Sequence, residues 1–328
     1  MLPIRFSIII TCHNQCEFIR AAVESALSQP HMLREVLVVD DGSTDGSVEL
    51  LEQFADSIRL VKFASNRGAI EARNEGARQA QGQYLVFLDG DDVLRRWALT
   101  VYESLITECK PKIIAAKALW FQGEVPVHRD RQVPHKIELI QYDSFLSKDR
   151  SYGMSASTWI IERRAFEKVG GWTAGIFHLD SVDLVMKLRE VGPVILVASP
   201  STVFYRVHAA NSIHSVPPFI DMLHRLIRKE KAGEYPGGAQ YQFQRRAFLG
   251  GLVFFWVKRG LRARLYKKVC KLLASGAPLV AAGFASRVGV KIKKLRPVEA
   301  VRMPVLGPAP DEQIVNGDPV VAASKSSF

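Results

Sequence analysis

Short apolar runs alternate with stretches of helical periodicity over the first 90 residues, and this alternation limits the possible folds more than any other feature. Residues 5–11 hold Phe6 and three consecutive isoleucines, a run too short for a helix and typical of a strand buried on both faces. Three similar runs follow at 35–40, 58–63 and 84–88. Helical spacing separates them at 17–29, 45–54 and 68–81. Four strands joined by single helices indicate a parallel, doubly wound α/β sheet.

Polar residues follow each of these four strands. They are Thr11 and Asn14, then Asp40-Asp41-Gly42-Ser43, then Asn66-Arg67, and finally Asp89-Gly90-Asp91-Asp92. Parallel α/β sheets bind ligands beyond the carboxyl ends of their strands, so these segments are expected to meet at one edge and form a ligand site. Asp89-Gly90-Asp91 is a DXD triplet, and two carboxylates in such a turn can converge on a divalent cation.

The rest of the chain divides into three expected parts. Strands are expected at 112–118, 155–161, 193–198 and 203–207, with helices at 164–169 and 180–191, which completes an α/β domain over residues 1–216. A basic helical module is expected over 217–296. Residues 297–328 lack periodicity and are expected to be a disordered tail.

The positive charge of the chain is concentrated in that module. The formal net charge is +11, yet the segment from Arg225 to Arg296 holds 18 Lys or Arg residues and only two acidic ones, Glu230 and Glu234. An excess of this kind is typical of segments that bind an anionic membrane or nucleic acid.

Apolar residues within the module follow helical spacing, and cationic residues occupy much of the remainder. The apolar set is Leu249, Leu252, Val253, Trp256, Leu261, Leu265, Val269 and Leu272. One amphipathic helix of this composition favours an anionic membrane surface as partner. The alternative is a helix that packs on the α/β domain and leaves its basic face in water. Because no nucleic-acid motif accompanies the charge, no nucleic-acid partner is expected.

The cysteines and the apolar runs indicate a compartment. Four cysteines without metal-site spacing are expected to be reduced thiols. No export signal is visible after Met1, and the longest uncharged runs are 15 residues, short of the roughly 20 that span a bilayer. A cytoplasmic protein is therefore expected, with peripheral association at the inner face of the cell membrane.

Taken together, the motifs resemble those of the family-2 inverting glycosyltransferases of the GT-A fold over roughly residues 6–212. The motifs are, in order, Ser7-Ile8-Ile9-Ile10-Thr11-Cys12-His13-Asn14, Val38-Val39-Asp40-Asp41-Gly42-Ser43, Ala72-Arg73-Asn74, Phe87-Leu88-Asp89-Gly90-Asp91-Asp92, Gly170-Gly171-Trp172, and Tyr205-Arg206-Val207-His208. The resemblance implies a metal-dependent hexosyltransferase that uses a nucleotide-sugar donor, with UDP expected and GDP and dTDP as alternatives.

The same resemblance implies roles for individual residues. The donor would be bound by Thr11, Asp41, Arg73, Asp89 and Arg206, and a Mg²⁺ or Mn²⁺ cofactor by Asp91, Asp89 and His208. A bound cation would stabilise the negative charge that develops on the departing nucleoside diphosphate.

Inverting transfer requires a general base that accepts the proton of the attacking hydroxyl. The family places this base in a Glu-Asp pair after the Gly-Gly-aromatic motif, where this chain has Asp180 and Ser181. Asp180 is the first candidate, since an Asp at a helix start is kept ionised by the helix dipole. Asp183 is the second, although it can instead pair with Lys187 at the i, i+4 spacing.

The expected function is therefore sugar transfer to a hydroxyl of a glycan or lipid-linked acceptor in cell-surface polysaccharide synthesis. Two alternatives remain open. One is a polyprenyl-phosphate glycosyltransferase, whose phosphate acceptor has less need of a strong base. The other is a non-catalytic subunit that binds a sugar nucleotide or a membrane.

Overall fold

The computed structural model describes residues 5–29, 34–126, 136–142, 155–192, 194–209, 211, 215–285, 292–294 and 298–299. Its first part follows the predicted alternation. The elements are β1 (Phe6–Cys12), α1 (Ile19–Leu27), β2 (Arg34–Asp40), α2 (Ser47–Glu52), β3 (Arg59–Lys62), α3 (Ala69–Gln79) and β4 (Tyr84–Asp89). Strands β3, β2, β1 and β4 are adjacent and parallel, so the doubly wound sheet is confirmed.

The second part adds further strands and helices. They are β5 (Val93–Leu94), α4 (Ala98–Cys109), β6 (Ile113–Ala115), β7 (Ala118–Phe121), β8 (Lys136–Tyr142), β9 (Trp159–Glu162), α5 (Arg163–Lys168), α6 (Asp180–Leu188), β10 (Val194–Ser199) and β11 (Val203–Arg206). The strand expected at 112–118 is divided between β6 and β7, which belong to different sheets. The strand expected at 155–161 begins with a 3₁₀ turn, Ala156–Thr158.

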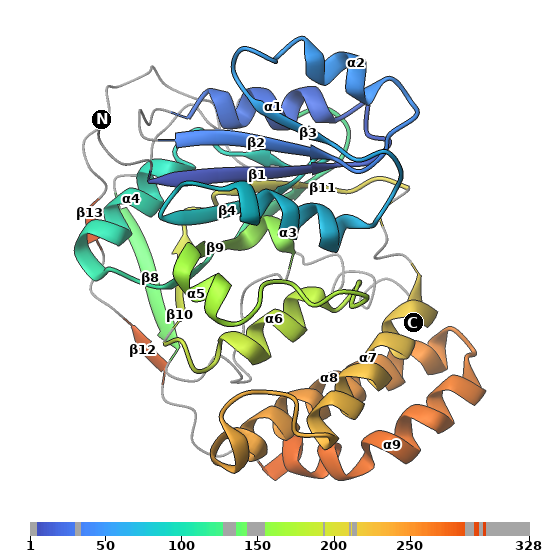
Figure 1. The fold of residues 1–328 in the computed structure, drawn as a ribbon. Coiled ribbons are helices and arrows are strands. Elements are labelled where there is room, and N and C mark those ends of the chain that lie inside the picture. Colours follow the sequence, from blue (N-terminus) through green and yellow to red (C-terminus); the bar gives the residue numbers. More distant parts are fainter. Residues whose placement is uncertain are drawn as a thin grey trace.

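The main sheet is mixed, and a small second sheet lies beside it. With β12 (Ile292–Lys294) at one edge, the order is β12-β8-β10-β6-β9-β4-β1-β2-β3, and it includes antiparallel pairing of β9 with β4 and of β8 with β10. Strands β5, β11 and β7 form the small sheet. In Figure 1, β1, β2 and β4 point toward one edge of the main sheet. That edge is where the sequence predicts the ligand site.

Helices cover both faces of the main sheet. Because strand side chains alternate between faces, Ile8 and Ile10 of β1 pack in the core beneath α1 and α4, whereas Ile9 packs in a second core with α5 and α6. Figure 1 shows α1 and α2 on one side of the sheet and α3, α5 and α6 on the other. This is the three-layer α/β arrangement predicted from the sequence.

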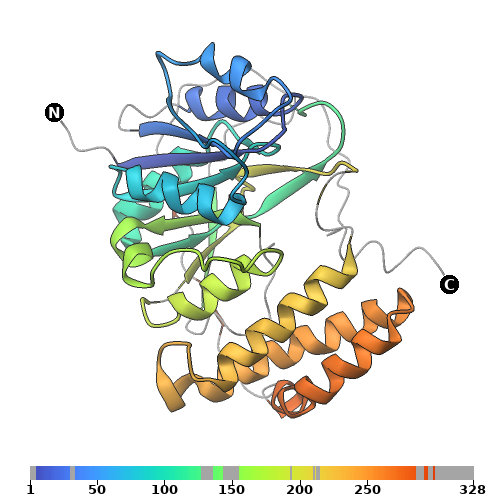
Figure 2. The ribbon, with the colours of Figure 1, turned by 45° about the vertical axis from the view of Figure 1, so that its right-hand side comes forward.

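The basic module consists of α7 (Val216–Lys231), α8 (Gln242–Arg262) and α9 (Tyr266–Ala285). The single amphipathic helix expected through Leu249–Leu272 is wrong: the chain reverses at 263–265, where Arg264 has a left-handed φ of 56°. Figure 2 shows the three helices side by side. Helical spacing of apolar residues continues through the turn, which is why periodicity alone did not reveal it.

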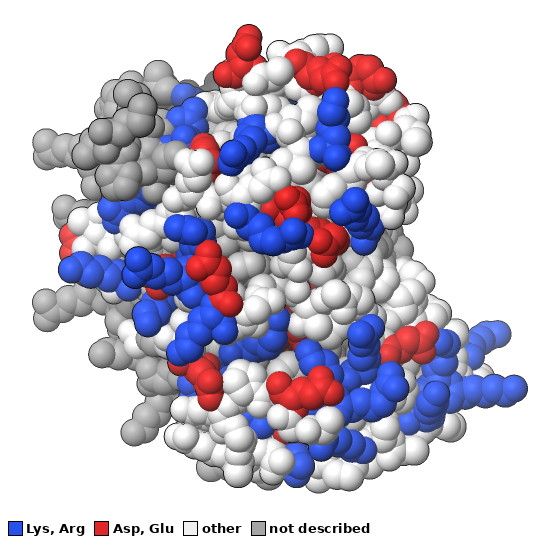
Figure 3. Space-filling view, viewed as in Figure 1, with Lys and Arg blue, Asp and Glu red and all other residues white. Residues whose placement is uncertain are grey.

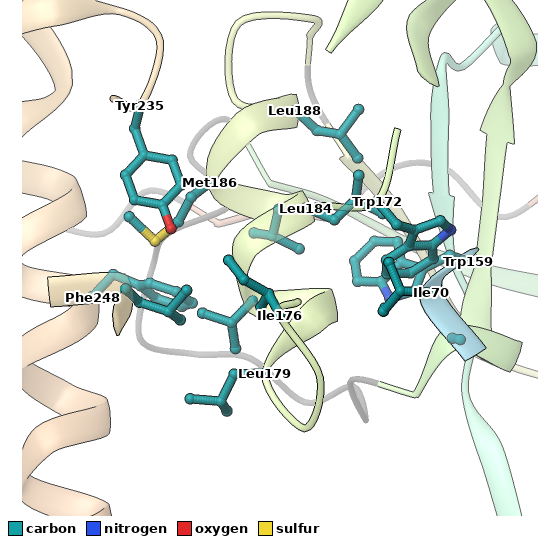
Figure 4. Packing of buried hydrophobic residues seen from close by; sticks show 14 of the residues in the cluster. Ile70, Trp159, Trp172, Ile176, Leu179, Leu184, Met186, Leu188, Tyr235 and Phe248 are labelled. Carbon is teal, nitrogen blue, oxygen red and sulfur yellow. The ribbon is translucent and has the colours of Figure 1, made fainter. Parts of the chain in front are cut away.

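Most of the apolar face expected to meet a membrane is buried inside the protein. Leu249, Val253, Trp256 and Leu272 belong to the same core as Ile9 of the central sheet. Figure 4 shows Phe248 of α8 among side chains from α6 and the loop before it. The alternative, a helix packed on the α/β domain, is correct for these four residues, because α6 and α7 belong to the same apolar cluster.

Two short strands follow the three helices, and the first of them lies within residues 217–296, so the expectation that this whole segment is helical is wrong at its end. β12 (Ile292–Lys294) and β13 (Val298–Glu299) both pair antiparallel with β8. The disordered tail expected from residue 297 is wrong at β13, where pairing with β8 orders the backbone, and its remaining residues lie outside the described part of the chain. None of the helices in the described ranges combines the length and apolarity that crossing a membrane requires.

Candidate active site

The polar segments after β1, β2 and β4 meet at one sheet edge, as predicted. Thr11 of β1 lies opposite Val39 of β2 on one side and opposite Asp89 of β4 on the other. Asp41 comes directly after the last residue of β2, and its N–H donates to Cys12 O over 2.8 Å. Parallel register therefore brings three of the predicted donor-binding residues to the same end of the sheet.

Asp41 organises the loop that leads into α3. Its Oδ1 accepts a hydrogen bond from Arg67 N at 2.6 Å, and its Oδ2 accepts one from Gly68 N at 2.8 Å. Gly68 has a φ of +92°, a conformation that L side chains rarely adopt. The buried carboxylate thus fixes the shape of the loop at the mouth of the site.

The glycine of the DXD triplet allows the turn to lie against the end of β1. Gly90 N donates to Thr11 O over 2.9 Å. A Cβ at Gly90 would lie 2.4 Å from Gln15 Oε1 and 2.8 Å from Thr11 O. This close approach places Asp89 and Asp91 on either side of a tightly held turn.

Asp92, the acid after the triplet, supports the turn from inside. It is buried and accepts hydrogen bonds from Ser157 Oγ at 2.6 Å and from Arg206 N at 3.0 Å. Burial, followed by the charges of Asp91 and Asp89, raises the pKa of Asp92 well above its ordinary value. Sequence reasoning quoted Asp92 in the motif but gave it no role, although a third acid beside a DXD triplet was an available signal.

Asp91 and His208 lie together, as the resemblance implied. His208 Nε2 is 2.9 Å from Asp91 Oδ2, and Asn211 Nδ2 donates to the same oxygen over 3.4 Å. The His208 ring packs against Phe18 with ring centres 4.7 Å apart. Burial, and then the nearby charge of Asp89, raises the pKa of Asp91. A carboxylate in this environment is suited to pairing with a cation.

Arg206 braces the same turn through its backbone contacts. Its Nε donates to Asp91 O over 2.9 Å, and its Nη1 donates to Gly123 O. The guanidinium lies 4.8 Å from the ring centre of Phe18 and 4.6 Å from that of Phe121. Arg206, implied to bind the donor, is thus buried and engaged in shaping the DXD turn.

Arg73 joins the DXD triplet to the candidate base. Its Nη2 is 2.7 Å from Asp89 Oδ1, and its Nη1 is 2.7 Å from Asp180 Oδ2. Burial would lower the pKa of this guanidinium, but the charges of Asp89 and Asp180 outweigh burial and raise it. Arg73 is therefore a permanent cation between two carboxylates that come from distant parts of the chain.

Asp180 begins α6 at this edge with its side chain 14% exposed. Its Oδ1 accepts a hydrogen bond from Ser181 N at 2.7 Å. Burial raises the pKa of Asp180, and the charge of Arg73 opposes that rise. A carboxylate with a raised pKa and partial access to water has the properties of a general base.

Asp183 occupies a different environment one turn along α6. Its side chain is 1% exposed and accepts hydrogen bonds from Thr173 Oγ1 at 2.5 Å, Lys229 Nζ at 2.5 Å and Tyr235 OH at 2.7 Å. Lys187 Nζ lies 4.0 Å away, at the i, i+4 spacing anticipated from the sequence. Asp183 thus fastens α6 to α7, whereas Asp180 faces the site.

The Gly-Gly-Trp motif is held by an asparagine of α3. Asn74 Nδ2 donates to Trp172 O over 2.9 Å, and Trp172 N donates to Asn74 Oδ1 over 3.0 Å. Gly171 has a φ of +64°, and a Cβ there would lie 2.8 Å from Asn74 Oδ1. This pairing fixes the segment that leads from the motif to Asp180.

Sequence reasoning missed His178, which lies two residues before Asp180 with a left-handed φ of 62°. Its ring lies 4.6 Å from that of Phe177 and 4.9 Å from that of Phe219. Aromatic rings commonly pack against sugars, but Trp159 and Trp172 are buried in the core, while Phe177 is exposed. Phe177 is thus the one of these three rings that is accessible to a ligand.

The donor atoms at the DXD turn fit a divalent cation that takes few ligands from protein. Within the described ranges, no three or more His, Cys, Asp or Glu side chains are grouped to hold a metal. Asp89 and Asp91 nevertheless keep 25% and 14% of their side chains exposed at one turn. Mg²⁺ is commonly bound by one or two carboxylates together with substrate phosphates, and this arrangement suits that mode.

A basic pocket lies beside α6, between the loop after Trp172 and α7. It has a volume of about 520 Å³ and is lined by Thr173, Arg225, Arg228, Lys229 and Glu234. Two of these residues, Thr173 and Lys229, bind Asp183, which is one helical turn from Asp180. The pocket therefore lies next to the residues that hold Asp183, and its lining has three basic residues and one acidic residue.

Comparison with known proteins places these features in a family. The family model described as Glycosyl transferase family 2 matches residues 7–170. The cholesterol galactosyltransferase of Borreliella burgdorferi is 35% identical over 99 residues, which are 30% of this chain and 28% of that enzyme. The chain thus spans less than a third of that relative. The UDP-Glc:alpha-D-GlcNAc-diphosphoundecaprenol beta-1,3-glucosyltransferase WfaP of Escherichia coli is 28% identical over 211 residues, 62% of this chain and 78% of that enzyme.

Solved structures share the fold at low sequence identity. TarS 1-349 of S. aureus in complex with UDP-GlcNAc has a TM-score of 0.56 at 15% identity, covering 93% of this chain and all of that one. The mannosyltransferase PcManGT of Pyrobaculum calidifontis, in complex with GDP-Man and Mn²⁺, has a TM-score of 0.50 at 17% identity, covering 86% of each chain. These likenesses establish the α/β fold with its helical C-terminal part.

Proposed function

We propose that this chain, which belongs to glycosyl transferase family 2, moves a sugar with inversion from a nucleotide-diphosphate sugar, UDP foremost, to a hydroxyl of a glycan or lipid-linked acceptor in cell-surface polysaccharide synthesis. One observation carries the proposal: Arg73 bridges Asp89 of the DXD triplet and Asp180 at the open edge of the sheet. The leaving-group side and the base side of a transfer reaction are thus linked through one buried cation.

The donor side is proposed to be the edge formed by Thr11, Asp41 and the DXD turn. Asp89 and Asp91 would hold Mg²⁺ or Mn²⁺, and Asp91 is oriented for this by His208. Such a cation, when bound, stabilises charge on the departing diphosphate. Arg206 contributes by holding the turn through Asp91 O.

Asp180 is proposed as the general base. It accepts the proton of the acceptor hydroxyl while that oxygen attacks the anomeric carbon, and the bond from that carbon to the diphosphate breaks on the opposite face. Arg73 favours the ionised form of Asp180 at neutral pH, because its charge opposes the effect of burial.

The acceptor is proposed to carry phosphate close to the sugar that is extended. Arg225 and Arg228 supply cations beside α6, and phosphate groups bind arginine through charge-assisted hydrogen bonds. The name of WfaP describes an acceptor of this kind, a sugar on diphosphoundecaprenol. Polyprenyl phosphate itself is the second candidate acceptor, since the same pocket suits it.

The reaction is proposed to take place in the cytoplasm. All four cysteines, Cys12, Cys16, Cys109 and Cys270, are free thiols. Proteins of oxidising compartments more often pair their cysteines, so reduced thiols favour this location.

The test is a panel of nucleotide sugars with and without Mn²⁺, scored by thermal stabilisation of the protein and by transfer to a diphosphate-linked sugar acceptor. A donor that binds only the folded state raises the melting temperature. We expect one UDP-sugar to stabilise the protein in a metal-dependent way and to be transferred with inversion. Stabilisation without transfer to either acceptor class would instead support the non-catalytic subunit, and transfer only to polyprenyl phosphate would support the second candidate.

A further inference from the structure

The outward side of the α8–α9 hairpin exposes large apolar side chains. Phe254 and Leu261 of α8 are 44% and 47% exposed, and Tyr266 and Leu273 of α9 are 60% and 42% exposed. The other exposed large apolar residues in the described ranges are Phe243 at 54% and Phe177 at 39%, and Phe243 also belongs to α8. We call Phe254, Leu261, Tyr266 and Leu273 the outer face.

Helix geometry places the outer face on one side of the hairpin. Phe254 and Leu261 are seven residues apart, as are Tyr266 and Leu273, and this spacing keeps each pair on one side of its helix. Each helix directs other residues toward its neighbours, since Val253, Trp256 and Leu272 are buried. The outer face is therefore distinct from the apolar positions that fill the core.

Close packing of the two helices brings their exposed residues together. A Cβ at Gly250 would lie 1.9 Å from Leu279 O, and one at Gly276 would lie 2.9 Å from Val253 Cγ1. Val253 directly precedes Phe254, and Leu273 is one helical turn from Gly276. Phe254 and Leu273 thus lie at neighbouring levels of the hairpin.

Cationic residues surround the outer face, and the hairpin contains no acid. From Gln242 to Ala285 the sequence has nine Lys or Arg residues and no Asp or Glu. Five of the nine are exposed, namely Lys258, Arg262, Arg264, Lys267 and Lys271. Figure 3 shows Lys and Arg side chains gathered at the lower right, over the module.

We propose that the outer face binds an anionic lipid surface, with Phe254, Leu261, Tyr266 and Leu273 entering the headgroup region and the surrounding lysines and arginines contacting lipid phosphates. Apolar side chains within a wholly cationic rim are typical of helices that lie in the membrane interface. Long Lys and Arg side chains also keep their charge in the headgroup layer while their aliphatic parts lie against apolar groups. Charge complementarity therefore selects an anionic bilayer as occupant.

The biological role of this lipid binding rests on the proposed function, because a lipid-linked acceptor is located at a membrane. Binding to lipid is measured without donor or acceptor, so the two proposals can fail separately. Residues expected from the sequence to enter the membrane, such as Leu249 and Trp256, are buried and take no part.

The experiment is co-sedimentation of the full chain with vesicles of phosphatidylcholine alone or mixed with phosphatidylglycerol, at low and at high salt. Two double variants test the outer face: Phe254→Ser with Leu273→Ser, and Lys258→Glu with Lys267→Glu. The matched control is Arg164→Glu with Lys168→Glu, which reverses two exposed charges on α5. Circular dichroism and melting temperature verify that each variant is folded, and a third variant, Leu261→Ser, replaces the apolar pair if that pair does not fold.

We expect the intact chain to bind the anionic vesicles, to bind phosphatidylcholine much less, and to be released by salt. Each outer-face double variant should bind about tenfold more weakly or worse, because it removes apolar contact or reverses two of five exposed charges. The control should bind like the intact chain. Absence of binding to anionic vesicles at low salt, equal weakening in the control, or tighter binding to a single-stranded RNA oligonucleotide than to vesicles would overturn the proposal.

Discussion

Replacing Asp180 and Asp183 separately by Asn should produce opposite defects, although the two residues lie on one helix. The substitution keeps the size of the side chain and removes its charge. The two residues are three positions apart on the helix, so their Cα atoms are separated by about 4.5 Å along the axis. Their surroundings differ, since Asp180 faces the site beside Arg73 and Asp183 is enclosed by Thr173, Lys229 and Tyr235.

Asp180→Asn should slow transfer and leave the fold nearly unchanged. Loss of a positioned base lowers turnover by about 10² to 10⁴, which is about 2.7 to 5.4 kcal/mol of barrier. Arg73 keeps its ion pair with Asp89 in this variant, so no buried cation is left alone. Donor affinity should therefore stay close to that of the parent protein.

Asp183→Asn should destabilise the protein and spare the chemistry. The change leaves Lys229, only 14% exposed, without the carboxylate that binds it at 2.5 Å. Breaking one side of a buried ion pair costs about 3–5 kcal/mol. Below its lowered melting temperature, this variant should transfer sugar at a rate within a few-fold of the parent.

The assay combines urea unfolding with steady-state transfer kinetics at a temperature where both variants are folded. Thr173→Val is a control for Asp183, because it removes one hydrogen bond to that carboxylate and leaves its charge pair. Full turnover by Asp180→Asn together with a folded but inactive Asp183→Asn would reverse the assignment of the base. Full turnover by both variants would favour polyprenyl phosphate as the acceptor, because a phosphate oxygen has less need of a general base.

Three further changes test other parts of the site. Arg73→Met should move the acid limb of the pH–turnover profile to higher pH, because Arg73 opposes the rise in the pKa of Asp180 and the base must be ionised; an unmoved limb would contradict this role. Asp91→Asn should abolish stabilisation by donor plus Mn²⁺ while the melting temperature without ligands changes little, as calorimetric titration and melting curves would show. Gly171→Ala should lower the free energy of unfolding by about 1–3 kcal/mol, because its Cβ would meet Asn74 Oδ1. Gly170→Ala, where a Cβ has open space at a φ of +72°, should cost less, and equal losses would refute the contact argument.

Local sequence patterns predicted the sheet and its ligand edge. Strand formation and the polar residues that follow each strand can both be recognised from residues close together in the sequence. The isoleucines of β1 are buried because helices cover both faces of the strand, and parallel register then brings Thr11 beside Asp89. The partners of the site residues were not predictable in the same way. Arg73 and Asp180 are 107 positions apart, and the residues around each of them do not indicate that the two side chains form an ion pair.

The module shows a second limit of sequence patterns. Helical spacing identified Leu249 and Leu272 as apolar positions but not what covers them, since a protein core and a lipid surface demand the same residue types. Exposure distinguishes the two cases: Leu272 is buried, and Leu273 beside it is not. A single residue step around a helix thus separates a core position from a candidate membrane contact.

The core shared by α6, α7 and α8 limits how this protein can be recombined with its relatives. Met186 of α6, Leu223 of α7 and Phe248 of α8 belong to one apolar cluster that continues to the central sheet. In a chimera joined at residue 216, the helices of a relative would have to pack against α6. The apolar surface of α6 is complementary to α7 and α8 of this protein and not to those helices. Exchange of acceptor or membrane preference between family members would therefore require the loop after Trp172 and α6 to be transplanted with the helices, and evolutionary divergence of these segments should be correlated for the same reason.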